Sequence, residues 1–309
     1  MRTLLTSCFL LLSIFLSAQS SSSEFKRISL YNESGFSSDE LEKNIPKGKI
    51  NPNGIAVVIG NKSYQNDVSS VEFASNDATI MYKYLTEMMG FKPENIIYRE
   101  NAKLSDLKLI FGDKDNHKGR LFNMSNSMSE IFIFYSGHGA PDPNDQNSYI
   151  MPIDADPNHL ALTGYKLETL YENISRIEHQ KATIVIDACF SGSTSNGEEI
   201  IKYASPVRIK IKKTTYSNSD NSVIITAAKN NQIASWYPQK KHGLLTYFFL
   251  KGLRGEADIN RDRKISVDEM TKYLTDRNNG VPGVARSIFS REQDPEIIGL
   301  PGFILNDNK

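Results

Sequence analysis

The fold is predicted from one apolar run and the small residues that follow it, Thr183-Ile184-Val185-Ile186-Asp187-Ala188-Cys189-Phe190-Ser191-Gly192-Ser193. The central run of this stretch, Ile184 to Ile186, is short, apolar and β-branched, which predicts a strand buried on both faces of a sheet. The small residues after Phe190 end the strand. Cys189 is therefore expected where a strand stops, and open α/β sheets bind their ligands at the carboxyl edge of their strands.

A second stretch has the same form. Ile131-Phe132-Ile133-Phe134-Tyr135 is an apolar run that breaks at Ser136-Gly137-His138-Gly139. If the two strands are parallel neighbours, His138 and Cys189 project from one edge of the sheet, where the imidazole helps to form the thiolate. The glycines beside His138 are expected to adopt φ values closed to other residues. The N–H groups of Gly139 and Cys189 are the expected oxyanion donors.

The beginning of the chain predicts a secretory signal peptide over residues 1–20. A basic start precedes an apolar run from Leu4 to Leu16 and a small-residue cleavage zone. The run is too short for a permanent membrane anchor, so a secreted or periplasmic protein without membrane contact is expected. The two cysteines are Cys8 and Cys189, and signal removal leaves Cys189 as an unpaired thiol.

A plainer interpretation stands beside the catalytic one, because free cysteines are often small buried hydrophobes. Of the other histidines, His117, His159 and His179 lie in polar surroundings and are assigned to the surface. His242, in Lys240-Lys241-His242-Gly243, is assigned to a basic loop. Only His138 follows a buried strand and is flanked by glycines.

The two motifs resemble those of caspase-like cysteine peptidases, and are most similar to metacaspases and bacterial caspase-family proteins. Three further segments resemble the same family over residues 51–305: Ala56-Val57-Val58-Ile59-Gly60, Phe73-Ala74-Ser75-Asn76-Asp77-Ala78, and His242-Gly243-Leu244-Leu245-Thr246-Tyr247-Phe248. The resemblance implies a caspase-like (haemoglobinase-like) α/β fold, a three-layer α/β/α sandwich with a mostly parallel central sheet. It also implies that His138 and Cys189 are the catalytic dyad.

The chain order predicts one catalytic domain. After the signal peptide, residues 21–50 are polar and indicate a linker or pro-segment. The domain spans 51–305, with a large-subunit portion at 51–193, a linker at 194–221 and a small-subunit portion at 222–305. Strands are expected at 55–59, 96–97 and 222–227, helices at 77–89, 105–111, 167–177 and 244–253, and a polar loop at 113–126. Ser105 is the expected N-cap of the second helix.

A substrate-binding pocket follows from the resemblance. In metacaspases the acidic residue two positions before the cysteine, the serine before Gly-His and the Asp of the Asn-Asp-Ala motif line a pocket for basic side chains. Here these residues are Asp187, Ser136 and Asp77, so cleavage after Arg or Lys is expected. The alternative for Asp77 is a helix cap.

The linker offers a place for self-processing. Arg208, Lys210, Lys212 and Lys213 are residues of the kind that the pocket accepts, so the enzyme is expected to cut itself there. The alternative is a solvated basic loop, because runs of charge usually lie at the surface.

A second motif, at 258–269, has the spacing of an EF-hand Ca²⁺ loop. The oxygen ligands would come from Asp258, Asn260, Asp262, Lys264, Ser266 and Glu269. Position six, normally glycine, is Arg263, and a left-handed conformation there costs on the order of 1 kcal/mol. The loop therefore either binds Ca²⁺ weakly or survives as a structural turn. The family resemblance offers Asp142, Asp154 and Asp156 as a separate candidate Ca²⁺ cluster.

Taken together, the sequence predicts a secreted cysteine endopeptidase that acts on peptides or proteins, needs no cofactor for its chemistry and has Ca²⁺ as a candidate ligand. Equal numbers of acidic and basic residues, 36 of each, give no net field to attract nucleic acid. The sequence leaves the oligomeric state open. The rival functions are a legumain-like transpeptidase or ligase and a catalytically silent binding module. A disulfide- or metal-dependent enzyme is disfavoured because one mature cysteine offers no ligand spacing.

Overall fold

The structure is a computed structural model, and it describes residues 40–142, 147–190, 221–229 and 232–307. The predicted signal peptide and nearly all of the predicted linker at 194–221 lie outside these residues. Within the described residues, no helix is long and apolar enough to cross a membrane.

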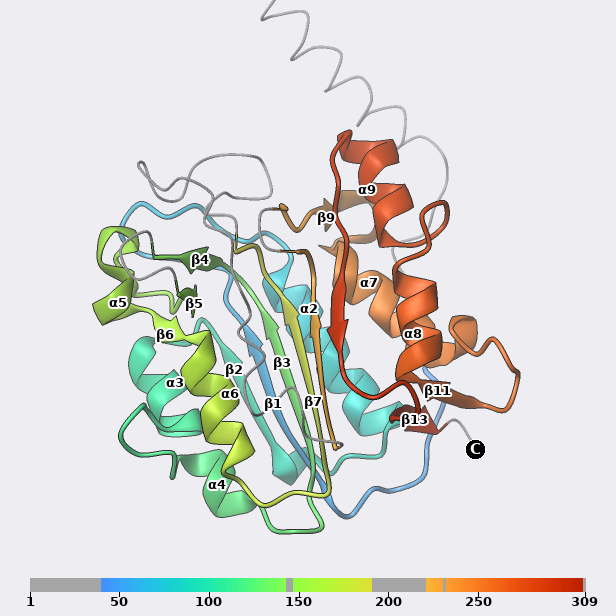
Figure 1. Ribbon diagram of the computed structural model, residues 1–309, viewed down its shortest axis with the longest axis horizontal. Coiled ribbons are helices and arrows are strands. Elements are labelled where there is room, and N and C mark those ends of the chain that lie inside the picture. Colours follow the sequence, from blue (N-terminus) through green and yellow to red (C-terminus); the bar gives the residue numbers. More distant parts are fainter. Residues whose placement is uncertain (1–39, 143–146, 191–220, 230–231, 308–309) are drawn as a thin grey trace, which may run out of the picture.

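A six-stranded sheet forms the centre of the described part of the chain (Figure 1). The strands β8, β7, β3, β1 and β2 run parallel, and β12 is antiparallel to β8 at one edge. In order across the sheet, they are β12 (Glu296–Ile298), β8 (Ser222–Thr226), β7 (Lys181–Asp187), β3 (Glu130–Ser136), β1 (Gly54–Gly60) and β2 (Ile96–Glu100).

Helices cover both faces of this sheet, which confirms the three-layer α/β/α arrangement (Figure 1). One face is covered by α3 (Leu104–Phe111), α4 (Arg120–Met124) and α6 (Leu167–Ser175). The other is covered by α2 (Ala74–Lys83), its π-helical continuation η1 (Tyr84–Met88), α7 (Leu244–Lys251), η6 (Gly252–Glu256), α8 (Val267–Leu274) and α9 (Val281–Phe289).

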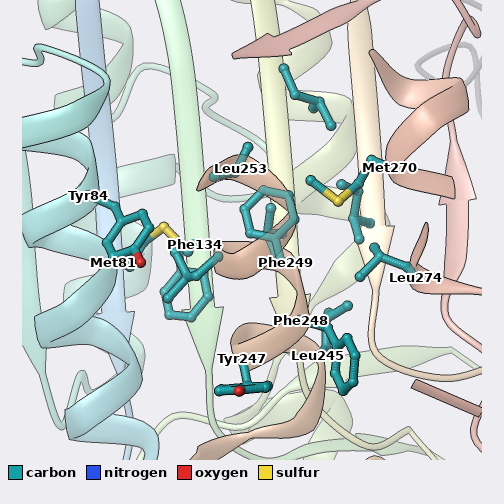
Figure 2. Packing of buried hydrophobic residues seen from close by; sticks show 14 of the residues in the cluster. Met81, Tyr84, Phe134, Leu245, Tyr247, Phe248, Phe249, Leu253, Met270 and Leu274 are labelled. Carbon is teal, nitrogen blue, oxygen red and sulfur yellow. The ribbon is translucent and has the colours of Figure 1, made fainter. Parts of the chain in front are cut away.

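The alternation of side chains along the strands divides the apolar core into two layers. In β1, Ala56 and Val58 pack toward α2 and α7, whereas Val57 and Ile59 pack toward α3 and α6. This is the expected result of a strand whose successive side chains point to opposite faces. In the first layer α7 is apolar all round, so it is buried among α2, β3 and α8; Figure 2 shows Phe249 among these elements.

Three smaller sheets lie outside the central sheet in the described residues. A three-stranded sheet follows His138, and two short antiparallel pairs lie in the C-terminal part. They are β4 (Gly139–Pro141) with β5 (Ser148–Ile150) and β6 (Tyr165–Lys166), β9 (Trp236–Tyr237) with β10 (His242–Gly243), and β11 (Lys264–Ser266) with β13 (Ile304–Asp307). The remaining described helices are single turns: η2 (Pro93–Asn95), η3 (Pro157–His159), α5 (Leu160–Thr163) and η5 (Pro238–Lys240).

The local predictions needed four corrections. The first helix begins at Ala74 rather than at Asp77. The N-cap of α3 is Lys103, whose N–H donates a hydrogen bond to the Asp106 carboxylate. Ser105 lies inside the helix and is not the N-cap. The predicted loop at 113–126 contains α4. Residues 40–50 are not a bare linker, because Leu41 is buried and its carbonyl accepts a hydrogen bond from Tyr84.

Candidate active site

The pairing of β3 with β7 brings the two predicted motifs together. The strands are parallel and in register, so that Ser136 lies beside Asp187. His138 and Cys189 each follow two residues later, at the carboxyl edge of the sheet. Both line one small cavity, together with Asp77, Ser136 and Asp187. The structure therefore gathers all five residues that the sequence assigned to the dyad and the pocket.

His138 is held in a defined orientation. Its Nε2 lies 2.8 Å from the carbonyl oxygen of Ser69, and its backbone N–H donates to the Tyr64 hydroxyl at 2.7 Å. A carbonyl only accepts hydrogen bonds, so Nε2 carries the proton and Nδ1 is left as the base. Burial lowers the pKa of His138 to about 4, and the Ser69 carbonyl opposes this only in part. The imidazole is therefore neutral at neutral pH.

The thiol of Cys189 is bonded to the backbone of a single residue. Sγ accepts the N–H of Ala234 at 2.9 Å and donates to the carbonyl of the same residue at 3.2 Å. Burial raises the pKa of this thiol to about 12, so the sulfur is protonated, and its proton points to Ala234. The dyad is thus present as a neutral thiol and a neutral imidazole.

The segment that covers the thiol is fastened by the residues before β12. The Gln293 side chain, which is fully buried, accepts the N–H of Ser235 and donates to the carbonyl of Ala227 at the end of β8. Gln232 forms a second pair with Asp294. The cavity around the dyad measures about 10 Å³, which is room for one water molecule at most. A cavity of this size does not hold a peptide side chain.

The glycines beside His138 serve a different purpose from the predicted one. Neither has a positive φ. Instead, a Cβ on Gly139 would lie 2.5 Å from the ring of Phe190, and a Cβ on Gly137 would lie 2.6 Å from the hydroxyl of Tyr135. These positions need glycine because the backbone is closely packed. Gly139, the predicted oxyanion donor, begins β4 next to Cys189.

Asp77 is the most heavily bonded side chain of the pocket. It is almost fully buried, and it accepts hydrogen bonds from Ser136 Oγ at 2.9 Å and from the Gly243 N–H at 3.1 Å. His242 Nδ1 lies 2.8 Å from its Oδ1. Asp77 lies within α2 and makes no capping bond, which excludes the cap interpretation. The assignment of His242 to a basic surface loop was also wrong, because this side chain is buried against Asp77.

Asp187 faces the same cavity from β7. Its Oδ2 accepts hydrogen bonds from the N–H and the hydroxyl of Thr246, at 2.9 and 2.7 Å. Burial, followed by the negative charge of Asp77, raises the pKa of Asp187 to about 7. Two carboxylates of like charge are thus buried side by side near the dyad, which is an arrangement typical of functional sites.

The EF-hand-like loop is ordered by its own hydrogen bonds. Asp258 accepts the N–H groups of Asp262 and Arg263, and Glu269 forms a capping box with Ser266 at the start of α8. Arg263 has φ 67°, the left-handed conformation that glycine usually supplies. The other predicted ligands, Asn260 and Lys264, lie in the same turn. Within the described residues, no group of three or more His, Cys, Asp or Glu side chains converges as a metal site.

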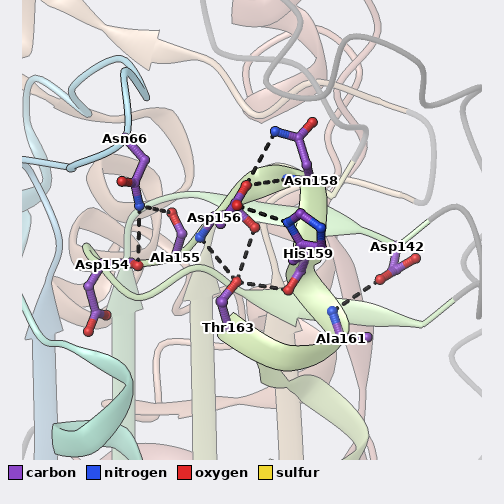
Figure 3. A network of polar contacts seen from close by, with 9 residues as sticks. All are labelled: Asn66, Asp142, Asp154, Ala155, Asp156, Asn158, His159, Ala161 and Thr163. Atoms are coloured by element: carbon purple, nitrogen blue, oxygen red, sulfur yellow. Dashed lines mark hydrogen bonds and ion pairs between the residues drawn. The ribbon is translucent and has the colours of Figure 1, made fainter.

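The second candidate Ca²⁺ cluster consists of three carboxylates with separate structural contacts (Figure 3). Asp142 accepts the N–H of Ala161, Asp154 accepts the N–H of Leu104, and Asp156 caps η3 and pairs with His159. Each carboxylate stabilises a local turn or helix start. Ca²⁺ binding at either place stays a prediction.

Sequence reasoning missed the residues that act through the backbone. The carbonyl of Ser69 and the amide of Ala234 carry no side-chain signal, so no residue pattern pointed to them. His242, Gly243 and Thr246 did have a signal, because they occur in one of the segments that resembles the caspase-like family. Their contacts with the two aspartates depend on the tertiary fold.

Comparisons with known proteins agree with this geometry. Residues 53–297 match the sequence profile of the caspase domain. Caspase-1 from Spodoptera frugiperda is similar in structure, with a TM-score of 0.55 and 15% identity over 86% of this chain and 97% of that one. Protein GSU0716 from Geobacter sulfurreducens is similar with a TM-score of 0.53 and 15% identity, over 81% and 95% of the two chains. No curated protein matches by sequence.

The covered thiol predicts slow alkylation. In the Cys8→Ser variant, iodoacetamide should modify Cys189 at least about 100-fold more slowly in the native protein than in urea, because burial withdraws both the sulfur and its thiolate form. Mass spectrometry at about pH 8 measures both rates. Leu109, which is 63% exposed, gives a control: Leu109→Cys in a Cys8→Ser, Cys189→Ala background should react readily in both conditions. Equal native and unfolded rates for Cys189 would contradict the covered site.

Proposed function

The chain belongs to the caspase family, whose members are cysteine hydrolases, and we propose that it is an endopeptidase that cleaves after Arg or Lys. The observation that carries this proposal is the pair of buried carboxylates, Asp77 and Asp187, in the cavity that His138 and Cys189 also line. A cationic side chain is the natural partner of the negative charge in such a pocket. An acidic side chain would be rejected by like-charge repulsion.

The chemistry is acyl transfer. Once the Ala234 segment moves off the sulfur, the Cys189 thiol gives its proton to Nδ1 of His138, and the thiolate attacks the peptide carbonyl carbon. The N–H groups of Gly139 and Cys189 stabilise the oxyanion. The protonated imidazole then donates its proton to the leaving amine as the C–N bond breaks. Water, deprotonated by His138, hydrolyses the thioester and restores the thiol.

The Ser69 carbonyl assists the proposed reaction by orienting the imidazole of His138. Because it holds the proton on Nε2 at 2.8 Å, it fixes the tautomer whose Nδ1 is a base, and it stabilises the imidazolium that forms during attack. This is the role that a carboxylate has in many other triads. In this chain the orienting group is a backbone oxygen, which no substitution of residue 69 removes.

A catalytically silent binding module is the second candidate. The observation that favours it is the small cavity of about 10 Å³ around a protonated thiol. Under this alternative the Ala234 segment never leaves the sulfur. The intact dyad and the acidic pocket favour the peptidase.

Secretion and Ca²⁺ stimulation are parts of the same proposal. The signal-like residues 1–20 support export to the periplasm or the outside of the cell. The EF-hand spacing at 258–269 supports Ca²⁺ binding. The left-handed conformation of Arg263 supports it further, because an EF-hand loop needs that turn at position six.

A panel of fluorogenic peptides tests the specificity. Peptides ending in Arg or Lys should be cleaved, and those ending in Asp or Asn should not, with and without Ca²⁺. Asp187→Asn should lower kcat/KM for the Arg peptide at least about 30-fold, because removal of one member of a buried ion pair costs about 2 to 5 kcal/mol. Cys189→Ala should abolish all cleavage. Preference for Asp over Arg would overturn the proposal.

Self-processing in the linker at 194–221 is the second test. Mass spectrometry of the purified protein should find cuts after Arg208, Lys210, Lys212 or Lys213, because these are residues that the pocket accepts. Cys189→Ala should remain uncut. A wild-type chain that is active and intact would show that processing is unnecessary, and the same cuts in Cys189→Ala would assign them to another protease.

A further inference from the structure

His242 is a buried side chain that contacts Asp77, one of the residues lining the proposed substrate pocket. It lies in β10, which pairs with β9 and precedes α7. Its side chain is 3% exposed, and Nδ1 is 2.8 Å from Oδ1 of Asp77. With Ser136 Oγ and the Gly243 N–H also bonded to it, Asp77 is saturated by donors from the chain itself.

Only one carboxylate oxygen of Asp187 accepts hydrogen bonds from the described residues. Both of its hydrogen bonds, from the N–H and the hydroxyl of Thr246, end on Oδ2. Its Oδ1 accepts no hydrogen bond from a described residue. The two carboxylates of the pocket therefore differ: Asp77 is occupied by the protein, and Asp187 keeps an oxygen for a ligand.

The backbone of Gly243 separates the two carboxylates. A Cβ at this position would lie 2.2 Å from Oδ2 of Asp187 and 3.1 Å from Oδ2 of Asp77. Only glycine fits between them. Two carboxylates at so short a separation cannot both be ionised without a compensating positive charge.

We propose that His242 is a specificity-determining residue that balances the charge of Asp77, so that Asp187 alone meets the cationic side chain of the substrate. This inference rests on the proposed cleavage after basic residues. The pocket then presents one uncompensated negative charge to one positive charge. Asp77 and His242 shape the pocket and keep Asp187 ionised.

The charged groups around His242 define the pH range of a test. Asp77 on α2 and Asp187 on β7 face the pocket, across which lies His138. Behind His242, a cavity of about 290 Å³ is lined by Glu42, Lys83, Lys240 and Lys241, and Lys240 also pairs with Glu40. Changes between about pH 6 and pH 8 are expected from Asp187, because its pKa is raised to about 7.

The sign of the pH dependence follows from the charge of Asp187. When pH rises through about 7, Asp187 loses its proton and attracts a cationic side chain, so cleavage after Arg should increase. An uncharged partner at position 242 leaves Asp77 unbalanced beside Asp187. Its negative charge then holds the proton on Asp187 more firmly, and the rise should move to higher pH.

The experiment compares an Arg peptide with its citrulline isostere, which has the same shape without the charge. Titration of His138 and Cys189 affects both peptides equally, so it cancels in the ratio of their kcat/KM values. The ratio therefore measures how strongly the pocket prefers the charged side chain at each pH. His242→Asn keeps a neutral donor at the place of Nδ1, and the midpoint of the ratio should rise by on the order of one pH unit. His159→Asn is the matched control, because His159 Nδ1 is 2.9 Å from Asp156 in an exposed pair. Its midpoint should equal that of wild type.

Asp77→Asn gives a second test that does not depend on the folding of His242→Asn. It removes the charge that needs balancing, so the midpoint should stay equal to or below that of wild type, and cleavage after Arg should suffer less than in Asp187→Asn. An unshifted midpoint in folded His242→Asn, or a larger loss in Asp77→Asn than in Asp187→Asn, overturns the inference. A wild-type ratio near one at every pH instead contradicts the proposed specificity, on which the inference rests.

Discussion

The in-register pairing of β3 with β7 is the constraint on which the rest of the structure depends. Ser136 stands beside Asp187 in this pairing, so the loops that carry His138 and Cys189 leave the sheet at the same level. A slip of one residue would turn each side chain to the other face of the sheet. Because both strands are buried on both faces, such a slip would also place each apolar side chain against the wrong layer of the core. Core packing and site geometry are thus fixed by the same hydrogen bonds.

The thiol is buried in the described part of the chain, and its surroundings favour the uncharged form. A neutral thiol and a neutral imidazole avoid the cost of buried charge, and Ala234 satisfies both hydrogen-bonding functions of the sulfur. Gln293 holds this segment to the end of β8. Exposure of the sulfur must break these bonds, so the proposed activity depends on a substrate, or another event, that stabilises the segment in its displaced position.

The sequence predicted the elements whose signal is local. The apolar runs at β1, β3, β7 and β8 were found because burial on both faces leaves a continuous apolar pattern, and the turn motifs after β3 and β7 placed His138 and Cys189 at one edge of the sheet. The pattern failed where tertiary contacts decide. Lys240 and His242 occur in a run that resembles a surface loop, yet both are buried, and they pair with Glu40 and Asp77. The Ala234 and Ser69 contacts use backbone atoms, which leave no trace in the sequence.

Covalent labelling with an Arg-derived acyloxymethyl ketone is the decisive measurement, because it requires His138, Cys189 and the acidic pocket to act on one molecule. One adduct is expected, mapped by mass spectrometry to Cys189, with strongly reduced labelling in His138→Ala. The citrulline analogue should label Cys189 much more slowly. A folded protein that gives no adduct with the Arg reagent, or that is labelled equally by both reagents, would show that this site is not a peptidase centre selective for basic residues.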